Sequence, residues 1–194
     1  MSNARVTQKV QLVGMDISEM ETLAAMHNEL PFRGKQLFHW VYKQQVNSID
    51  SMNTLPSLFR DLLADEYVLH PLILIKKTGS ALEPTHKFLL QLPSGEKIES
   101  VIMEEGKRVT LCVSTQVGCA VDCKFCATAK MGFIKNLTAG EIVDQYLLIL
   151  NSINKRITNV VFMGMGEPFL NYQQVVNAAN LLNHKEGINL SAKR

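Results

Sequence analysis

The segment "VTLCVSTQVGCAVDCKFCATAKMGF", residues 109–133, contains all four cysteines of the chain. It begins as an apolar run typical of a buried strand and continues into a loop with Cys119, Cys123 and Cys126 inside eight residues. In a reducing compartment, cysteines clustered in this way indicate metal ligands or catalytic thiols rather than a disulfide framework.

The chain around this loop alternates between strands and helices. A strand is expected at 109–115, a helix at 137–154, a second strand at 157–166 and a second helix at 171–184. Thr138 and Glu141 have the spacing of a capping box at the start of the first helix. Alternating units of this kind predict parallel strands with helices outside them. Two units cannot close a barrel, so we expect residues 108–194 to be the first part of a larger one.

The first 107 residues are expected to fold differently. Three helices are predicted between Asp16 and Tyr67, and they define a helical N-terminal domain over residues 1–70. Short extended runs with a turn at Ser94 and Gly95 predict a β-hairpin connecting region over residues 71–107. The predicted fold class is therefore α/β, a truncated (β/α) barrel preceded by a helical domain and a hairpin region.

Composition excludes few functions but limits the location. The chain has 194 residues, of which 46% are hydrophobic, and a formal net charge of +2. The N-terminus lacks the apolar region of a signal peptide, and the longest apolar run, residues 146–150, is too short to cross a bilayer. We therefore expect a cytoplasmic protein with no membrane partner.

The spacing Cys-x3-Cys-x2-Cys supplies three ligands, whereas a structural zinc site needs four. A four-iron, four-sulfur (4Fe-4S) cluster held by three cysteines leaves one iron open, and S-adenosylmethionine can bind there for radical chemistry. Phe125, just before the last cysteine, suits packing beside the adenine of that cofactor. Two alternatives stay open: a zinc loop completed by His184 or Cys112, and a cluster used only for electron transfer.

A second motif, "MGMGEP" at 163–168, follows the second predicted strand. Glycines there allow a ligand to approach the backbone closely, and Glu167 can accept a hydrogen bond from an ammonium group. Alone, the motif is equally typical of a tight turn between a strand and a helix. Beside the cysteine loop, it favours binding of the methionine end of the cofactor.

Other polar residues are less specific. Cys112 in the predicted strand is typical of a small core residue, and Glu99 is typical of a solvated strand position. The N-terminal domain also has a basic edge interleaved with aromatic residues, a combination that suits RNA. That edge comprises Arg33, Lys35, His39 and Lys43, with Phe32, Trp40 and Tyr42.

Several long motifs together resemble one family. The segments "RVTLCVSTQVGCAVDCKFCATAKMGF", "NLTAGEIVDQ", "NVVFMGMGEPFLNY", "LPFRGKQLFHWVY" and "KIESV" are similar to the radical-SAM RNA adenine C2-methyltransferases, which modify large-subunit ribosomal RNA and, in some members, transfer RNA. The resemblance covers nearly the whole chain. It implies an RNA-contacting helical domain before a partial radical-SAM barrel.

The resemblance also implies roles for particular residues. Cys119, Cys123 and Cys126 would ligate the 4Fe-4S cluster. Gly166 and Glu167 would contact S-adenosylmethionine. Glu99 matches the proposed proton acceptor and Cys112 the cysteine that resolves a protein–RNA adduct, which favours a chemical role for Cys112 over a core role. A reductase system would serve the cluster and the resulting disulfide.

The chain also departs from the family pattern. The family's methyl-carrying cysteine follows much later in the sequence, and no cysteine follows Cys126 here. Lys135 stands where the family more often has arginine. We therefore expect the 194-residue chain to be catalytically incomplete alone. Two other functions remain open: C8 methylation of adenine in ribosomal RNA by a related activity, and an RNA-binding module with a structural metal site.

Overall fold

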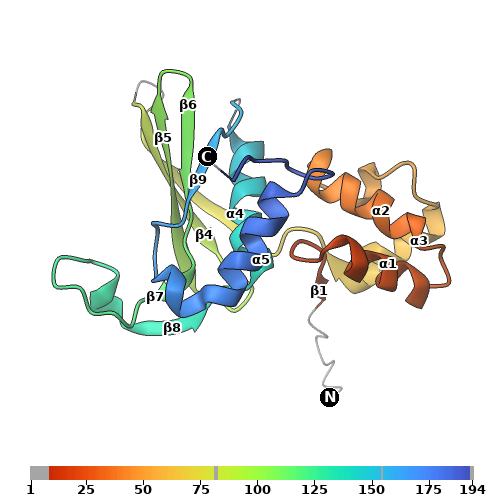
Figure 1. The fold of residues 1–194 in the computed structure, drawn as a ribbon, viewed down its shortest axis with the longest axis horizontal. Helices are drawn as coiled ribbons and strands as arrows, with labels where there is room; N and C mark the ends of the chain where they lie inside the picture. The colour runs from red at the N-terminus through yellow and green to blue at the C-terminus, as the bar shows by residue number, and fades with distance from the viewer. Residues whose placement is uncertain (1–8, 81–82, 154, 193–194) are drawn as a thin grey trace, which may run out of the picture.

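The computed structural model describes residues 9–80, 83–153 and 155–192. Its main sheet has five strands in the order β3-β4-β5-β6-β9 (Figure 1). The first four are antiparallel neighbours, whereas β6 and β9 run parallel. The strands are β3 (Ile73–Thr78), β4 (Thr85–Gln91), β5 (Lys97–Glu105), β6 (Arg108–Cys112) and β9 (Asn159–Val161).

The predicted βαβ unit is present as β6, α4 (Ala139–Ser152) and β9. Its capping box is confirmed, because Thr138 Oγ1 accepts from the Glu141 backbone N–H and Glu141 Oε2 accepts from the Thr138 N–H. α4 and α5 (Tyr172–Asn183) lie on one face of the sheet (Figure 1). The α/β class predicted from the sequence is confirmed. The helix expected at 137–154 ends earlier, at Ser152, and Asn154 lies outside the described residues.

The strands expected in 71–107 are not a separate connecting hairpin. They form one continuous sheet with β6 and β9. The reason is the alternation in β5, where Ile98, Ser100 and Ile102 are buried between sheet and helices while their neighbours face outward. The predicted turn is confirmed, since the Gly95 N–H donates to the Leu92 carbonyl at 2.9 Å.

The N-terminal part is helical, as predicted, although its first eight residues lie outside the described ones. Its helices are α1 (Ile17–Met26), α2 (Phe32–Phe38) and α3 (Ser57–Glu66), and α2 continues into a π-helical turn, His39–Lys43. Asp16 and Glu19 form a second capping box. A short parallel pair, β1 (Val10–Gln11) with β2 (Tyr67–Val68), was not expected, because two-residue strands have no periodicity to detect.

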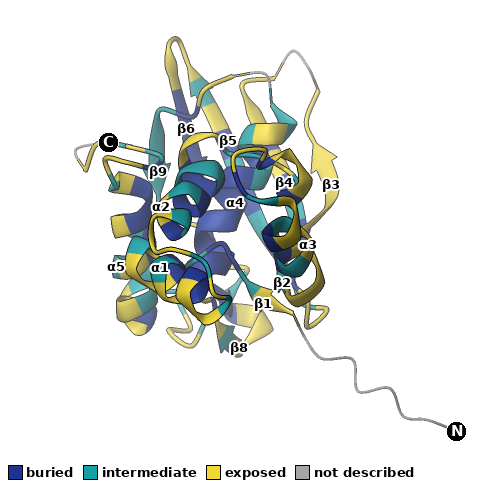
Figure 2. Cartoon of the chain, turned by 90° about the vertical axis from the view of Figure 1, so that its right-hand side faces the viewer, coloured by how far each residue is buried: buried dark blue, intermediate teal, exposed yellow. Residues whose placement is uncertain are grey.

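Helix α4 lies between the sheet and the N-terminal helices, and Figure 2 shows it dark blue behind α1, α2 and α3. Asp144 on α4 is fully buried and binds both preceding parts of the chain. Its carboxylate accepts from His70 Nδ1 at 2.5 Å and from the Leu72 N–H at 3.0 Å. His70 Nε2 lies 3.2 Å from the Val46 carbonyl oxygen, so one buried pair joins the helical domain to the sheet and α4.

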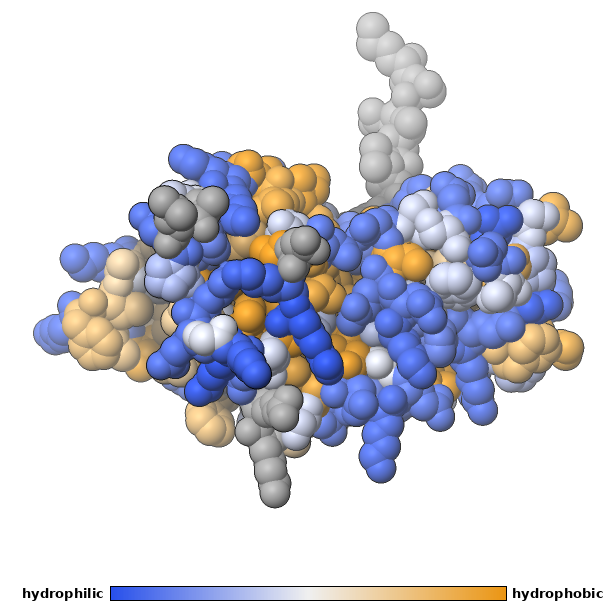
Figure 3. Space-filling view, turned by 90° about the horizontal axis from the view of Figure 1, so that it is seen from above, coloured by the Kyte–Doolittle hydropathy of each residue, from blue (hydrophilic) through white to orange (hydrophobic). Residues whose placement is uncertain are grey.

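The other face of the sheet carries no helix of the described chain (Figure 1). The end of the molecule seen from above is covered mainly by hydrophilic side chains (Figure 3). The opposite, lower end carries the cysteine loop and the residue 163–167 loop. No helix among the described residues is both long and apolar enough to span a membrane.

Candidate cluster and cofactor site

The cysteine loop is the tip of a second, smaller hairpin. Its strands are β7 (Gln116–Gly118) and β8 (Phe133–Asn136), which pair antiparallel and were not predicted from the sequence. The Cys119 N–H donates to the Gly132 carbonyl at 3.1 Å and closes the neck of the loop. The hairpin projects from the lower end of the sheet (Figure 1), and its three cysteines are all partly exposed.

The three thiols of the loop are free and half-exposed. Hydrogen bonds from the backbone of Ala129 and Thr128 lower the pKa of the Cys126 thiol, which favours the thiolate that metals bind. Across residues 9–80, 83–153 and 155–192, no three side chains of metal-binding type are grouped closely enough to hold a single ion. The hairpin therefore brings the cysteines onto one loop without converging them. Three free, accessible thiols are a donor set that fits an iron–sulfur cluster.

Gly118 at the neck of this hairpin cannot carry a side chain without a change in the backbone. Its φ is +72°, and a Cβ atom there would lie 1.7 Å from the Gly132 carbonyl oxygen. We expect Gly118→Ala to open the neck, with a strain of about 1–3 kcal/mol, and to reduce iron and sulfide bound after anaerobic reconstitution by more than half. Iron analysis and thermal unfolding would measure both effects.

Gly95→Ala is the matched control, because Gly95 also has a positive φ, +97°, but open space around its Cβ position. This variant should lose about 1 kcal/mol of stability to its backbone conformation alone and should keep its iron. Equal iron content in the two variants would contradict the role assigned to the neck.

The second loop, residues 163–167, leaves β9 at the same end of the sheet and is anchored to the segment after β6. The Met165 N–H donates to Ser114 Oγ at 2.9 Å, and its carbonyl accepts from the Thr115 N–H at 2.8 Å. Gly166 has a φ of +97°, and a Cβ atom there would lie 2.5 Å from the Cβ of Gln116. Glycine is therefore required at 166 because the space that a side chain would need is filled by Gln116.

Glu167 is half-buried beside Gly166. Its Oε1 accepts from the Phe169 N–H at 3.1 Å and caps a short 3₁₀ helix, Pro168–Asn171. Its own N–H donates to Gln116 Oε1 at 2.9 Å. The carboxylate is therefore held in place by the turn that follows it, with its negative charge at the rim of the loop.

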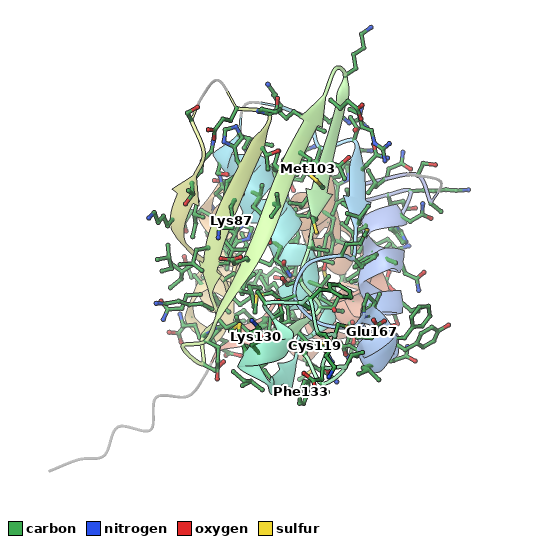
Figure 4. The ribbon with its side chains drawn as sticks, turned by 90° about the vertical axis from the view of Figure 1, so that its left-hand side faces the viewer. Lys87, Met103, Cys119, Lys130, Phe133 and Glu167 are labelled. Atoms are coloured by element: carbon green, nitrogen blue, oxygen red, sulfur yellow. The ribbon has the colours of Figure 1, made fainter. Side chains whose placement is uncertain are left out.

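Glu99 and Cys112 lie on the open face of the main sheet. Val101 pairs with Cys112 across β5 and β6, and Glu99 is two residues from Val101, so all three side chains point to one face. Figure 4 looks onto this face: Lys87 and Met103 lie on it, and Cys119, Phe133 and Glu167 lie toward its lower end. Glu99 forms an ion pair with Lys87, with 2.9 Å between Oε1 and Nζ.

Cys112 is 8% exposed at the end of β6. Burial raises the pKa of its thiol, and a hydrogen bond with the backbone of Met163 offsets part of that rise. The thiol therefore rests protonated and touches the 163–167 loop. It would have to lose its proton before acting as a nucleophile.

Sequence reasoning missed a group of buried polar residues that joins these parts. Gln145 of α4 accepts from the Ser114 N–H and from Ser100 Oγ, both at 2.8 Å, and donates to the Ser114 carbonyl at 2.9 Å. Ser114 Oγ in turn donates to the Glu99 carbonyl at 2.6 Å. The available signal was the polar run Ser-Thr-Gln at 114–116, directly after an apolar strand and before the cysteines.

Two sequence-based interpretations are wrong. His184 does not complete a zinc site, because it follows the last residue of α5, roughly 18 Å along that helix from its start. Its ring packs instead against Phe38, with 4.9 Å between the ring centroids. Tyr42 is not available to stack on a base, because it is fully buried, with its hydroxyl bonded to Gly14 and Met15.

The basic edge is also partly committed to the protein itself. Arg33 donates to Gln36 and to the Thr54 carbonyl, and Trp40 Nε1 donates to Thr54 Oγ1 at 2.8 Å. Phe32 remains 45% exposed, with the Arg33 guanidinium 4.6 Å from its ring centroid. Phe32, Lys35 and Lys43 are the exposed members of this edge, whereas Arg33 is half-buried.

Comparison with known proteins agrees with this arrangement. The model for the ribosomal RNA large subunit methyltransferase N-terminal domain matches residues 10–69, and the radical SAM superfamily matches residues 113–193. The chain is 44% identical over 163 residues to a probable dual-specificity RNA methyltransferase RlmN from Thermotoga neapolitana, covering 84% of this chain and 48% of that one. Both parts of the chain are thus similar to RlmN proteins of the radical SAM superfamily.

Other members of the RlmN family show the same extent of similarity. The Syntrophomonas wolfei protein of the same name is 40% identical over 200 residues, covering 96% of this chain and 56% of its own. A crystal structure of a radical SAM methyltransferase from Sphaerobacter thermophilus superposes with a TM-score of 0.89 at 39% identity, over 95% of this chain and 55% of that one. The chain spans about half the length of the curated relatives it matches.

Proposed function

We propose that the chain is part of a radical S-adenosylmethionine methyltransferase that methylates C2 of adenosine in large-subunit ribosomal RNA, with transfer RNA as a further substrate. One observation carries the proposal: the hairpin with three free cysteines and the Gly166–Glu167 loop lie at the same end of the sheet, with Cys112 touching that loop. The similar proteins named dual-specificity RNA methyltransferases support the substrate class.

Five residues would hold the cofactors. Cys119, Cys123 and Cys126 would bind the 4Fe-4S cluster as thiolates, and Cys126 is already biased toward that form. Gly166 would let the methionine end of S-adenosylmethionine approach the backbone, and Glu167 would accept from its ammonium group. When bound, the cluster and cofactor would supply the one-electron chemistry that an unreactive aromatic carbon requires.

Glu99 and Cys112 would act on the RNA. Glu99 would take the proton that leaves C2, and its half-exposed position on the open face is accessible to a base. The Cys112 thiolate would attack the sulfur of a methyl-carrying cysteine outside this chain. In the adduct that sulfur would be joined to C2 through a methylene group; an S–S bond would form, the bond between the sulfur and the methylene carbon would break, and that carbon would keep the electron pair and take a proton to become the methyl group.

This proposal implies partners and a location. A two-electron reductant would have to reduce the disulfide and restore the Cys112 thiol, and an electron donor would have to reduce the cluster. The exposed Phe32 of the helical domain would contact RNA by stacking, and the exposed Lys35 and Lys43 would contact it by charge. We expect the protein to act in the cytoplasm, where such reductants and RNA would be available.

The test is anaerobic reconstitution with iron and sulfide, followed by electron paramagnetic resonance of the reduced protein with and without S-adenosylmethionine. We expect a four-iron signal that changes when the cofactor is added, and no 2-methyladenosine from this chain alone. Tightly bound zinc, or a cluster signal indifferent to the cofactor, would refute the proposal and support a structural metal site.

A further inference from the structure

Gln116 is a buried residue with no role in the function proposed above. It is 1% exposed at the start of β7, between the cysteine hairpin and the 163–167 loop. Its side-chain oxygen accepts from the Glu167 N–H at 2.9 Å, and its side-chain nitrogen donates to Asn136 Oδ1 on β8 at 2.8 Å. A single amide group therefore bridges the loop proposed to bind the cofactor and the hairpin proposed to bind the cluster.

The bridge needs a side chain that both accepts and donates, as the Gln116 amide does. It must accept a hydrogen bond from the Glu167 N–H and donate one to Asn136. An apolar side chain can do neither, and an ammonium group can only donate. The backbone of Gln116 holds the same loop, because its N–H donates to the Met165 carbonyl at 3.2 Å. Gly166 packs against the Cβ of Gln116, so the loop follows any displacement of this residue.

A second buried amide holds a different part of the same region. Asn171 donates to the Thr115 and Leu137 carbonyls, both at 2.8 Å. These contacts hold the base of the hairpin, where it joins the main sheet and α4. They hold Glu167 only indirectly, through the turn that it caps, whereas the Gln116 side chain bonds both the Glu167 N–H and Asn136 of β8.

We propose that Gln116 is a positioning residue that sets the distance between the cysteine hairpin and the Gly166–Glu167 loop. The inference rests on the proposed function, in which one cofactor molecule must contact both parts at once. A ligand that contacts two separate segments binds more weakly when only a fraction of the protein has the segments at the right distance. A shift of about 1 Å at such a site is enough to impair it strongly.

Three substitutions test the bridge on the reconstituted chain. Asn136→Ala removes only the hairpin end, at an exposed position where the fold tolerates a change. Asn136→Asp keeps an acceptor at the same place and should restore the bridge. Gln116→Met removes both hydrogen bonds at nearly constant volume. Gln174→Met is the matched control, since Gln174 Oε1 also accepts from one backbone N–H, that of Ala139, at 2.8 Å.

The first readout is equilibrium binding of S-adenosylmethionine to protein with a measured iron content. We expect binding weakened about fivefold in Asn136→Ala and about tenfold or more in Gln116→Met, at unchanged iron content. Asn136→Asp and Gln174→Met should bind as the unsubstituted protein does. The second readout needs no cofactor: hydrogen exchange should speed up together at the Glu167 amide and in β8 of Gln116→Met.

The outcomes separate this inference from the function on which it rests. If the unsubstituted protein binds the cofactor and Gln116→Met and Asn136→Ala bind equally well, the bridge has no positioning role and only the inference fails. If the unsubstituted protein shows no cofactor response, the proposed function fails, and the inference with it. Loss of binding in Asn136→Asp as well as Asn136→Ala would also overturn the inference, because the acceptor would not be what matters.

Discussion

Replacement of Cys123 with serine is expected to abolish the cofactor-sensitive four-iron signal and to remove most of the bound iron. A serine hydroxyl stays protonated at neutral pH and is a poor ligand for iron in a cluster. No other thiol can replace it, because the chain's only cysteine outside the loop, Cys112, is buried in the main sheet. Iron and sulfide analysis with electron paramagnetic resonance of the reduced protein would measure the loss.

Cys112→Ser is the matched control for this experiment. It makes the same exchange of a thiol for a hydroxyl, but outside the hairpin. Iron content and the response to S-adenosylmethionine should therefore stay within about twofold of the unsubstituted protein. Full iron in Cys123→Ser, or iron lost equally in Cys112→Ser, would show that the hairpin cysteines do not form the site.

Replacement of Asp144 with alanine is expected to lower the free energy of unfolding by about 3–5 kcal/mol. The substitution leaves the buried His70 ring and the Leu72 N–H without the acceptor that each has now. It also disconnects α4 from the segment that joins the sheet to the helical domain. Urea unfolding followed by circular dichroism would measure the change.

Asp65→Ala removes an exposed carboxylate from α3 and serves as the control. Its effect should stay within about 0.5 kcal/mol, as for most surface substitutions. An Asp144→Ala protein as stable as Asp65→Ala would mean that the buried pair contributes nothing to the fold.

The same pair predicts how stability depends on pH. Burial alone lowers the pKa of His70, but the hydrogen bond and charge of Asp144 outweigh it, so the pKa lies above the ordinary value of 6.5. Burial raises the pKa of Asp144, and the hydrogen bond from His70 offsets part of that rise. At both groups the folded protein holds protons more tightly than the unfolded chain, so the pair's contribution to stability decreases as pH rises.

For His70, the contribution is fully present below pH 6.5 and is lost as the pH rises through the raised folded-state value. Urea unfolding between pH 6 and about 9 should therefore show falling stability, and Asp144→Asn should remove that fall because the neutral amide no longer favours the charged imidazole. A fall of the same size in Asp144→Asn would assign it to other groups.

The sequence predicted the elements whose signals are local. The Thr138 and Glu141 capping box depends on residues three apart, so it could be predicted, whereas the burial of α4 on all sides depends on the sheet and the N-terminal helices that pack around it. The grouping of Cys119, Cys123 and Cys126 is also local, because a spacing of three and two residues confines the thiols to one loop whatever the rest of the chain does. Family motifs extended this prediction to Glu99, Cys112, Gly166 and Glu167, whose roles remain proposals.

The sequence could not predict contacts between distant segments. β7 and β8 are short strands on either side of the cysteines, and their pairing depends on a neck closed between Cys119 and Gly132. His70 and Asp144 are 74 residues apart, and neither position looks unusual in the sequence. Tyr42 looked like part of an RNA-contacting edge and is a core residue, because its helical turn faces the segment that carries Gly14.

By itself, then, the sequence determined the α/β class, the helix starts and the set of thiols, because each follows from residues within about one or two turns of one another. Only the tertiary structure decided that Gln116 lies between the hairpin and the 163–167 loop, and that Cys112 touches that loop. These contacts arise from strand order and register, which bring residues about 50 positions apart to one end of a sheet. Local propensity carries no information about such pairings, since many partners would satisfy the same backbone equally well.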